Sequence, residues 1–61
     1  MDGLDVEILR LLSEDARLSF NEIARRLGVS PATVAARVRR MEREGVIRGY
    51  TVKVDHEKLG L

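Results

Sequence analysis

Apolar residues near the start of the chain recur at helical spacing. The spacing i, i+4, i+7, i+8 places four of them on one side of an amphipathic helix, namely Leu4, Ile8, Leu11 and Leu12. Asp2 is a candidate N-cap, and the early acids Asp5 and Glu7 favour the positive end of the helix dipole. We therefore predict a helix over residues 3–13, followed by a polar connection over 13–17.

A second helix is predicted over residues 20–27. Ser19 and Glu22 fit the S-x-x-E capping box, in which each side chain accepts from the other residue's amide. Leu18 and Ile23 stand at the two positions of a hydrophobic staple. Gly28 follows at once, where a left-handed residue commonly ends a helix. The buried stripe is predicted to hold Phe20, Ile23, Ala24 and Leu27.

A third helix is predicted over residues 31–44. Ser30 is a candidate N-cap, and Pro31 stands at the first helical position, where its missing N–H is not needed. Gly45 ends the run, and an apolar anchor follows at Val46 and Ile47. Residues on one face are predicted to be buried: Val34, Val38 and Met41. Residues 49–55 then alternate with period two and predict a β-strand.

Two short helices joined by a tight turn that begins with glycine are typical of a helix-turn-helix. The small residue Ala24, in the middle of the second helix, lets the third helix approach closely. The predicted fold is mainly α: a three-helix, winged-helix-like helix-turn-helix domain followed by a C-terminal β-strand. In this arrangement the third helix enters the major groove of DNA and the second lies across the backbone.

Composition limits the possible chemistry. The 61 residues allow one small domain, and the absence of cysteine excludes disulfides and thiolate zinc sites. His56 alone cannot form a histidine metal cluster, and we expect neither a metal nor a cofactor. No apolar run approaches the length of a membrane span, and the start lacks the pattern of a signal peptide. We expect a cytoplasmic protein with no membrane partner.

The formal net charge of +1 hides an asymmetry. Residues 1–24 hold six acids against two arginines, a balance of −4, whereas residues 25–50 hold seven arginines against two acids, a balance of +5. The middle of the chain therefore predicts one positively charged face. Phe20 resembles a core residue and Tyr50 lies on the predicted strand, so neither forms a stacking platform for single-stranded nucleic acid. Double-stranded DNA is the expected partner.

The outer side of the third helix is the predicted reading surface. Small side chains allow the helix to sink into a groove, and long arginines reach guanine edges or phosphates. The residues predicted to contact bases are Ala32, Thr33, Ala36, Arg37 and Arg40. Those predicted to contact phosphates are Ser19, Asn21, Arg25, Arg26, Ser30, Arg39, Arg43 and Arg48.

These features together resemble the N-terminal domain of the leucine-responsive regulatory protein/AsnC (Lrp/AsnC) family of transcription regulators. The matching stretches are residues 4–12, 15–19, 22–31, 34–42 and 45–50. The resemblance implies sequence-specific DNA binding as a homodimer or higher oligomer, at the nucleoid in the cytoplasm of a prokaryote. It also implies a second, α/β domain that binds an amino-acid effector and that this sequence does not contain. We therefore divide the chain into a DNA-binding domain at 1–48 and a linker strand with tail at 49–61. The family's linker strand tends to pair with its partner's, which places Tyr50, Val52 and Val54 at a dimer contact.

Two other interpretations stay open on the sequence. The chain could be a winged-helix-like protein-interaction module whose arginines face a partner's acids. It could also be a regulatory fragment of an AsnC-like enzyme such as a siroheme decarboxylase. Asp55 and His56 form an acid–histidine neighbour pair, but adjacency in sequence does not create catalytic geometry. We expect no catalytic residues, and the sequence does not decide between an excised domain and a natural single-domain protein.

Overall fold

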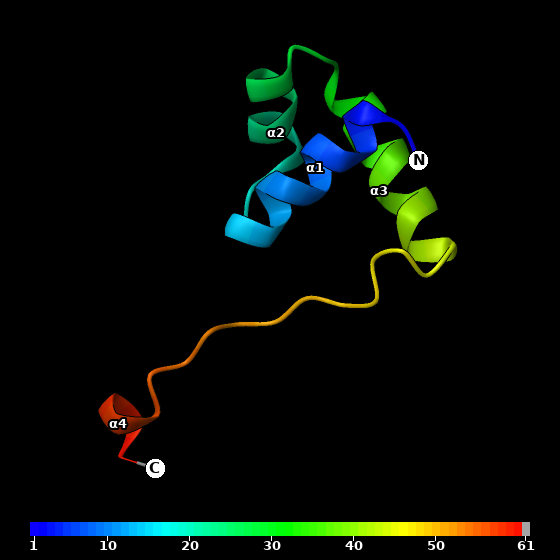
Figure 1. The fold of residues 1–61 in the computed structure, drawn as a ribbon. Coiled ribbons are helices and arrows are strands. Elements are labelled where there is room, and N and C mark those ends of the chain that lie inside the picture. The colour runs from blue at the N-terminus through cyan, green and yellow to red at the C-terminus, as the bar shows by residue number, and fades with distance from the viewer. Residues whose placement is uncertain (61) are drawn as a thin grey trace.

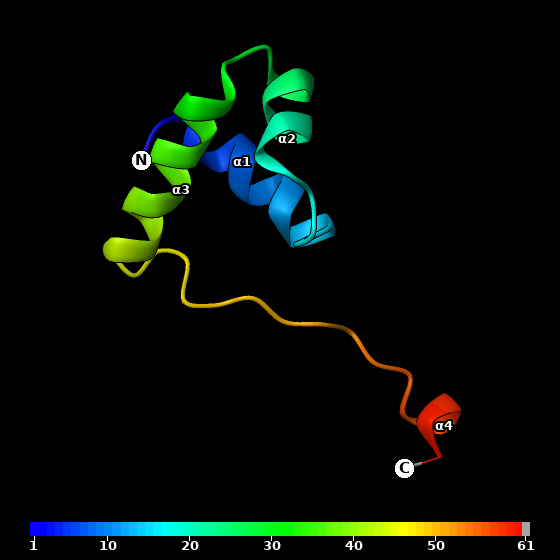
Figure 2. The same ribbon diagram turned by 180° about the vertical axis from the view of Figure 1, so that it is seen from behind.

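The computed structural model describes residues 1–60 and shows four helices there. They are α1 (Gly3–Glu14), α2 (Phe20–Leu27), α3 (Pro31–Arg43) and the short α4 (His56–Leu59). The bounds predicted for α2 are confirmed, and those for α1 and α3 differ by one residue at the C-terminal end. Helices α2 and α3 pack directly on each other, and α1 packs against both. Figure 1 shows this arrangement with the N-terminus beside α3, and Figure 2 shows it from behind.

Local caps explain where the helices begin and end. Asp2 caps α1 as predicted: it accepts from the Asp5 amide at 3.1 Å, and Asp5 accepts from the Asp2 amide at 3.3 Å. Such reciprocal bonds satisfy amides that have no partner inside the helix. The full capping box predicted for α2 is wrong in one half. Ser19 accepts from the Glu22 amide at 3.0 Å, but the Glu22 carboxylate binds arginines of its own helix instead.

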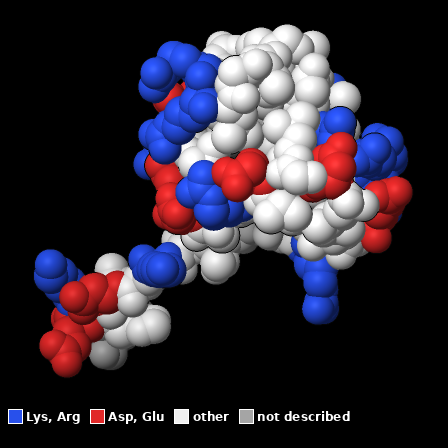
Figure 3. All heavy atoms as spheres, turned by 45° about the horizontal axis from the view of Figure 1, so that its top comes forward, with Lys and Arg blue, Asp and Glu red and all other residues white. Residues whose placement is uncertain are grey.

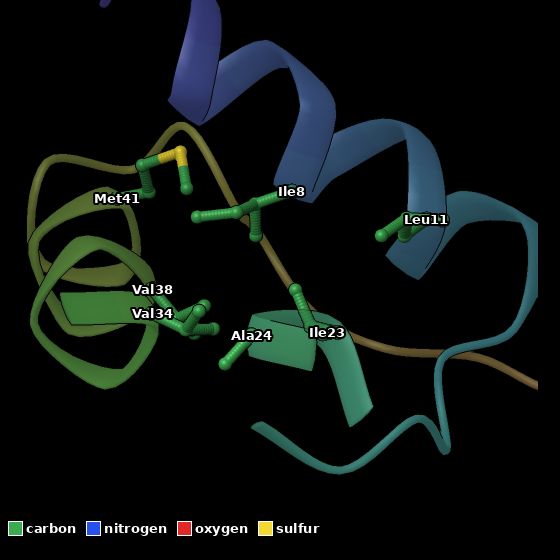
Figure 4. Close-up of a cluster of buried hydrophobic side chains, with 7 residues drawn as sticks. All are labelled: Ile8, Leu11, Ile23, Ala24, Val34, Val38 and Met41. Atoms are coloured by element: carbon green, nitrogen blue, oxygen red, sulfur yellow. The ribbon is translucent and has the colours of Figure 1, made fainter. Parts of the chain in front are cut away.

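The core consists of side chains from all three long helices (Figure 4). Ile8 points from α1 into the space between α2 and α3, where it is fully buried. Ala24 points from α2 toward Val34 and Val38 of α3 and is 2% exposed. This small side chain lets the two helices pack closely, as predicted. The buried hydrophobic residues are Ile8, Leu11, Ile23, Ala24, Val34, Val38 and Met41. Phe20 and Leu27, which were also predicted to be buried, are only partly buried against this core.

The end of α3 is closed by a left-handed glycine. Gly45 has φ of +76°, and the amides of Val46 and Ile47 then donate to the Met41 carbonyl at 2.9 and 3.1 Å. Ile47 is partly buried against the core, whereas Val46 is 42% exposed. One half of the predicted apolar anchor is therefore confirmed.

The predicted strand over 49–55 is wrong for this structure. No strand is present among residues 1–60; the chain runs out from α3 as an extended, unpaired segment and ends in α4 (Figure 1). Period-two alternation describes only which side each residue faces, whereas a strand also needs a neighbour for its hydrogen bonds. Val52 is 76% exposed, and no other part of the described chain pairs with its backbone. Helix α4 has local signals instead, with Asp55 as N-cap and Gly60 at φ of +76°.

Candidate nucleic-acid interface

The turn between α2 and α3 brings the start of α3 to one end of the molecule. Gly28 adopts the left-handed conformation, with φ of +70° and ψ of +33°, and so ends α2 as predicted. Nothing lies within 4 Å of a Cβ built at this position, so glycine is favoured here by its backbone conformation and not by crowding. Only Gly28 and Val29 separate α2 from the cap of α3.

Ser30 and Thr33 form a small hydroxyl pair at the start of α3. The Ser30 hydroxyl accepts from the Thr33 amide at 3.1 Å, which confirms the predicted cap. The two hydroxyl oxygens are 2.9 Å apart, so one hydroxyl hydrogen is used between them and the other remains for an outside acceptor. Pro31 has no N–H, and the Ala32 amide donates to no group within residues 1–60. Two donors at this helix start can therefore meet an anion.

The exposed side of α3 combines small residues with arginines. Ala32, Ala36, Arg39 and Arg43 are exposed, whereas Thr33, Arg37 and Arg40 on the flank are partly buried. Residues 27–36 include no charged residue, so the turn and the first half of α3 are neutral. Figure 3, in which the end bearing this turn comes forward, shows an uncharged upper region with basic side chains on both sides of it.

The arginines of α2 are paired within their own helix. Arg26 Nε lies 3.0 Å from Glu22 Oε2, and the Arg25 guanidinium binds the same oxygen. Hydrogen bonds from Arg26 and then Arg25 lower the pKa of Glu22 below its ordinary value. Ser19 and Asn21, at the start of the same helix, are exposed. The residues of α2 and of its N-cap that are predicted to contact phosphates thus lie on the surface, and Arg25 and Arg26 among them are paired with Glu22.

Two other arginines join α3 to the start of α1. Arg37 Nη1 lies 2.7 and 2.8 Å from the two carboxylate oxygens of Asp2 and 3.1 Å from Asp5 Oδ1. Arg40 Nη2 lies 2.8 Å from Asp5 Oδ2. The Asp5 side chain is 0% exposed, and the hydrogen bonds from the two arginines and the Asp2 amide compensate both its carboxylate oxygens. Arg37 and Arg40 were predicted to contact bases, and the structure places both in ion pairs with α1.

The ionisation of these acids reflects the same contacts. The hydrogen bond from Arg37, followed by that from the Asp5 amide, lowers the pKa of Asp2 from 3.8 to about 2. Burial opposes ionisation of Asp5, but hydrogen bonds from Arg37 and from the Asp2 amide outweigh it and lower the pKa of Asp5. Both carboxylates are therefore charged at neutral pH.

Three arginines on α3 and after it have no acid partner among the described residues. Among residues 1–60, ion pairs within 4.0 Å involve none of these three: Arg39, Arg43 and Arg48. All three are exposed. The seven arginines of residues 25–50 thus divide into four that are paired with acids and three that are not.

The segment that follows α3 lies opposite the second half of α1, across an open hollow. Tyr50 is half-exposed, and its hydroxyl donates to Glu42 Oε2 at 2.9 Å, which ties the segment to α3. Burial of the ring and the neighbouring Glu42 carboxylate raise the pKa of Tyr50. The lining of the hollow includes Leu9, Leu12, Ile47, Tyr50 and Val52. Val54, also predicted at a dimer contact, is 43% exposed.

Sequence reasoning missed Asp2 and Asp5 as partners of α3. A signal was present: at 3.6 residues per turn, Asp5 falls beside Leu12 on the apolar side of α1, where a carboxylate needs a cationic partner. Within the described part of the chain, no three metal-binding side chains gather, and no helix is long and apolar enough to cross a membrane.

Comparison with known proteins agrees with this geometry. Residues 1–48 match the family described as winged helix-turn-helix DNA-binding. The chain is 47% identical over 60 residues to the HTH-type transcriptional regulator LrpA of Pyrococcus horikoshii, covering 98% of this chain and 43% of that protein. It is also 47% identical to the regulatory protein AsnC of Haemophilus influenzae, covering 98% of this chain and 40% of that protein.

Among solved structures, Bacillus subtilis LrpC superimposes with a TM-score of 0.91 at 44% identity, covering 100% of this chain and 44% of that one. The chain thus spans about two fifths of the length of these relatives, which are named as regulators and not as enzymes. The chain belongs to the winged helix-turn-helix DNA-binding family, and the resemblance to Lrp/AsnC regulators predicted from its sequence is confirmed.

Proposed function

We propose that this chain binds double-stranded DNA sequence-specifically, as the reading domain of an Lrp/AsnC-like transcription regulator. The observation that carries the proposal is the exposed side of α3, where small neutral residues stand at the start of the helix and unpaired arginines stand further along it. A major groove admits an α-helix, and its base edges lie between two lines of phosphates.

The neutral first half of α3 enters the groove. Ala32 and Ala36 have methyl groups that can contact the methyl of thymine, and the partly buried Thr33 lies at the flank. At the rim, the remaining hydroxyl hydrogen of the Ser30–Thr33 pair and the Ala32 amide donate to one phosphate. This contact fixes the register of α3 and carries no sequence information by itself.

Arginines supply the attraction to the backbone. Arg39, Arg43 and Arg48 are exposed and pair with no acid among residues 1–60, so each is available to a phosphate. On α2 we assign further phosphate contacts to Ser19 and Asn21 and to the outer edges of Arg25 and Arg26, whose guanidinium groups have donors beyond those used by Glu22.

Pairing of copies and effector binding belong to the same proposal. We infer that the regulator acts as a homodimer or higher oligomer, and that the exposed residues Tyr50, Val52 and Val54 lie at the contact between copies. One structural relative is described as an L-Met complex of a Neisseria meningitidis transcriptional regulator. By analogy, we infer that an amino-acid effector binds to a part of the regulator other than this DNA-reading domain. We place the protein in the prokaryotic cytoplasm, at the nucleoid.

The proposal is tested by selecting random duplexes on the purified chain and sequencing them. The binding constants for the enriched and random duplexes are then measured as a function of salt concentration, and the logarithm of each constant is plotted against the logarithm of the salt concentration. Each phosphate contact contributes a slope of about −0.9 to the logarithmic plot. The double variant Arg39→Gln/Arg43→Gln should flatten the slope by about 1.8 if both arginines contact phosphates. The control, Lys53→Gln/Lys58→Gln, removes the same charge from the segment beyond α3 and should change it little.

Two outcomes refute the proposal. One is the absence of any enriched motif together with salt-independent binding, which favours the protein-interaction module. The other is an equal loss in the arginine and lysine double variants, because binding would then depend on total charge and not on the α3 surface.

A further inference from the structure

Arg37 and Arg40 lie on the predicted reading helix but direct their guanidinium groups at α1. Arg37 Nη1 has two hydrogens and meets three carboxylate oxygens, two from Asp2 and one from Asp5, so this nitrogen is fully used. Nη2 and Nε keep donors, but these bonds fix the position of the whole guanidinium group beside the start of α1. Arg40 binds the remaining oxygen of Asp5. These bonds connect residues at least 32 positions apart in the sequence.

The buried partner makes these bonds costly to break. Asp5 is fully buried, and the Arg37 side chain is only 27% exposed. If Arg37 and Arg40 turned toward DNA, the Asp5 carboxylate would lose its cationic partners while still shielded from water, which is strongly unfavourable. Asp2 differs, because its side chain is 57% exposed and solvent can replace the lost arginine.

Two other arginines of α3, Arg39 and Arg43, differ from Arg37 and Arg40 in having no acid partner among residues 1–60. Both side chains are exposed. They can meet phosphates without breaking any contact that the domain already has.

We propose that Asp5, assisted by Asp2, is a positioning residue that withholds Arg37 and Arg40 from DNA and fixes α3 against α1. Arg39 and Arg43 then supply the attraction of α3 to the DNA phosphates. The neutral residues Ala32, Thr33 and Ala36 contact the bases. This inference rests on the proposed function, since it assigns separate roles to the residues of the DNA-binding surface. It revises the sequence prediction that Arg37 and Arg40 read bases.

The experiment compares four single variants of the 61-residue chain that each remove one charge from α3: Arg37→Gln, Arg40→Gln, Arg39→Gln and Arg43→Gln. Thermal unfolding, the salt slope on random duplex and the ratio of affinities for enriched and random duplex are measured for each. Arg37→Gln and Arg40→Gln should lower the unfolding midpoint and leave the slope and the ratio unchanged. Arg39→Gln and Arg43→Gln should keep the midpoint and flatten the slope by about 0.9 each.

Asp5→Asn supplies the converse test. It keeps the shape of the side chain and removes the charge that binds Arg40, whereas Asp2 still binds Arg37, so the slope on random duplex should become steeper by about 0.9, the contribution of one phosphate contact by Arg40. Simple destabilisation of the domain does not steepen this slope. Should Asp5→Asn or Arg37→Gln fail to fold, Arg40→Gln decides, because its side chain is 43% exposed and binds only one oxygen of Asp5.

The inference is overturned if Arg37→Gln or Arg40→Gln flattens the slope, or lowers the affinity ratio, as a base or phosphate contact would. A folded Asp5→Asn chain with the parent's slope also overturns it. Such results leave the proposed function intact, because the parent chain still binds DNA. If the parent shows no salt-dependent binding to duplex, the proposed function fails and this inference fails with it.

Discussion

Replacing Ala24 by valine tests whether the two helices of the reading unit depend on a small residue where they pack. Ala24 is 2% exposed and points at Val34 and Val38, so the two added methyl groups of valine meet these side chains. Overpacking of this kind costs about 1–3 kcal/mol, and the lower helix propensity of valine adds up to about 0.7 kcal/mol. A domain of 61 residues has a total stability of about 3–9 kcal/mol. The substitution therefore removes a large part of it.

The matched control is Ala36→Val, which makes the same change at an exposed position within α3. It carries the propensity cost without the packing cost, so the difference between the two variants isolates packing. Thermal unfolding followed by circular dichroism measures both, and each 1 kcal/mol corresponds to about 4–8 °C in a domain of this size. Ala24→Val should melt well below Ala36→Val. Equal midpoints would refute the claim that α2 and α3 pack closely at Ala24.

The remaining predictions concern caps and charge. Because Asp2 has a pKa lowered from 3.8 to about 2, its ion pair stabilises the domain above about pH 4 and is lost as the pH falls toward 2. Acid titration of Asp2→Asn should show a weaker dependence in that window, and an unchanged curve would exclude the pair. Ser30→Ala should cost about 1 kcal/mol of stability, whereas Ser30→Asp should keep the cap yet weaken DNA binding; a stable Ser30→Asp chain with full affinity contradicts the phosphate contact. Gly28→Ala should cost about 1–2 kcal/mol in denaturant unfolding, because its φ of +70° disfavours a side chain, and Gly28→Asn should cost less.

The helices could be predicted because their ends are set by local chemistry. Ser30 and Pro31 begin α3, and Gly28 ends α2, through bonds that span three or four residues and backbone preferences of single residues. The core could be predicted for a similar reason, since Val34, Val38 and Met41 share one face whatever lies opposite them. Such signals are complete within a short window of sequence.

The segment beyond α3 could not be predicted from its alternation. Tyr50, Val52 and Val54 follow the period of a strand, but whether a strand forms depends on a partner that this pattern does not name. The signals for α4 were local and were available, since Asp55 precedes it and Gly60 follows it. The alternation predicts a strand over residues 49–55, whereas the caps at Asp55 and Gly60 indicate the short helix that the structure shows.

The roles of the arginines could be predicted only in part. A helical projection gives the direction of Arg37 and Arg40 about the axis of α3, and it correctly sets both apart from the buried face. It does not include the acids of α1, which approach only after the two helices pack at a particular angle. The ion pairs therefore depend on tertiary structure, and only the position of Asp5 on the apolar side of its helix indicated them.

This pairing leaves a charge distribution that suits a duplex. A groove presents neutral base edges at its floor and charged phosphates along both rims, so a reading helix gains from neutral residues at its tip and cations beside it. Residues 27–36 are neutral, and the unpaired Arg39, Arg43 and Arg48 all follow them in the chain. Were Arg37 also unpaired, a cation would stand nearer the tip. The carboxylates of Asp2 and Asp5 neutralise it there, so the acidic start of α1 helps to set the charge pattern of the reading surface.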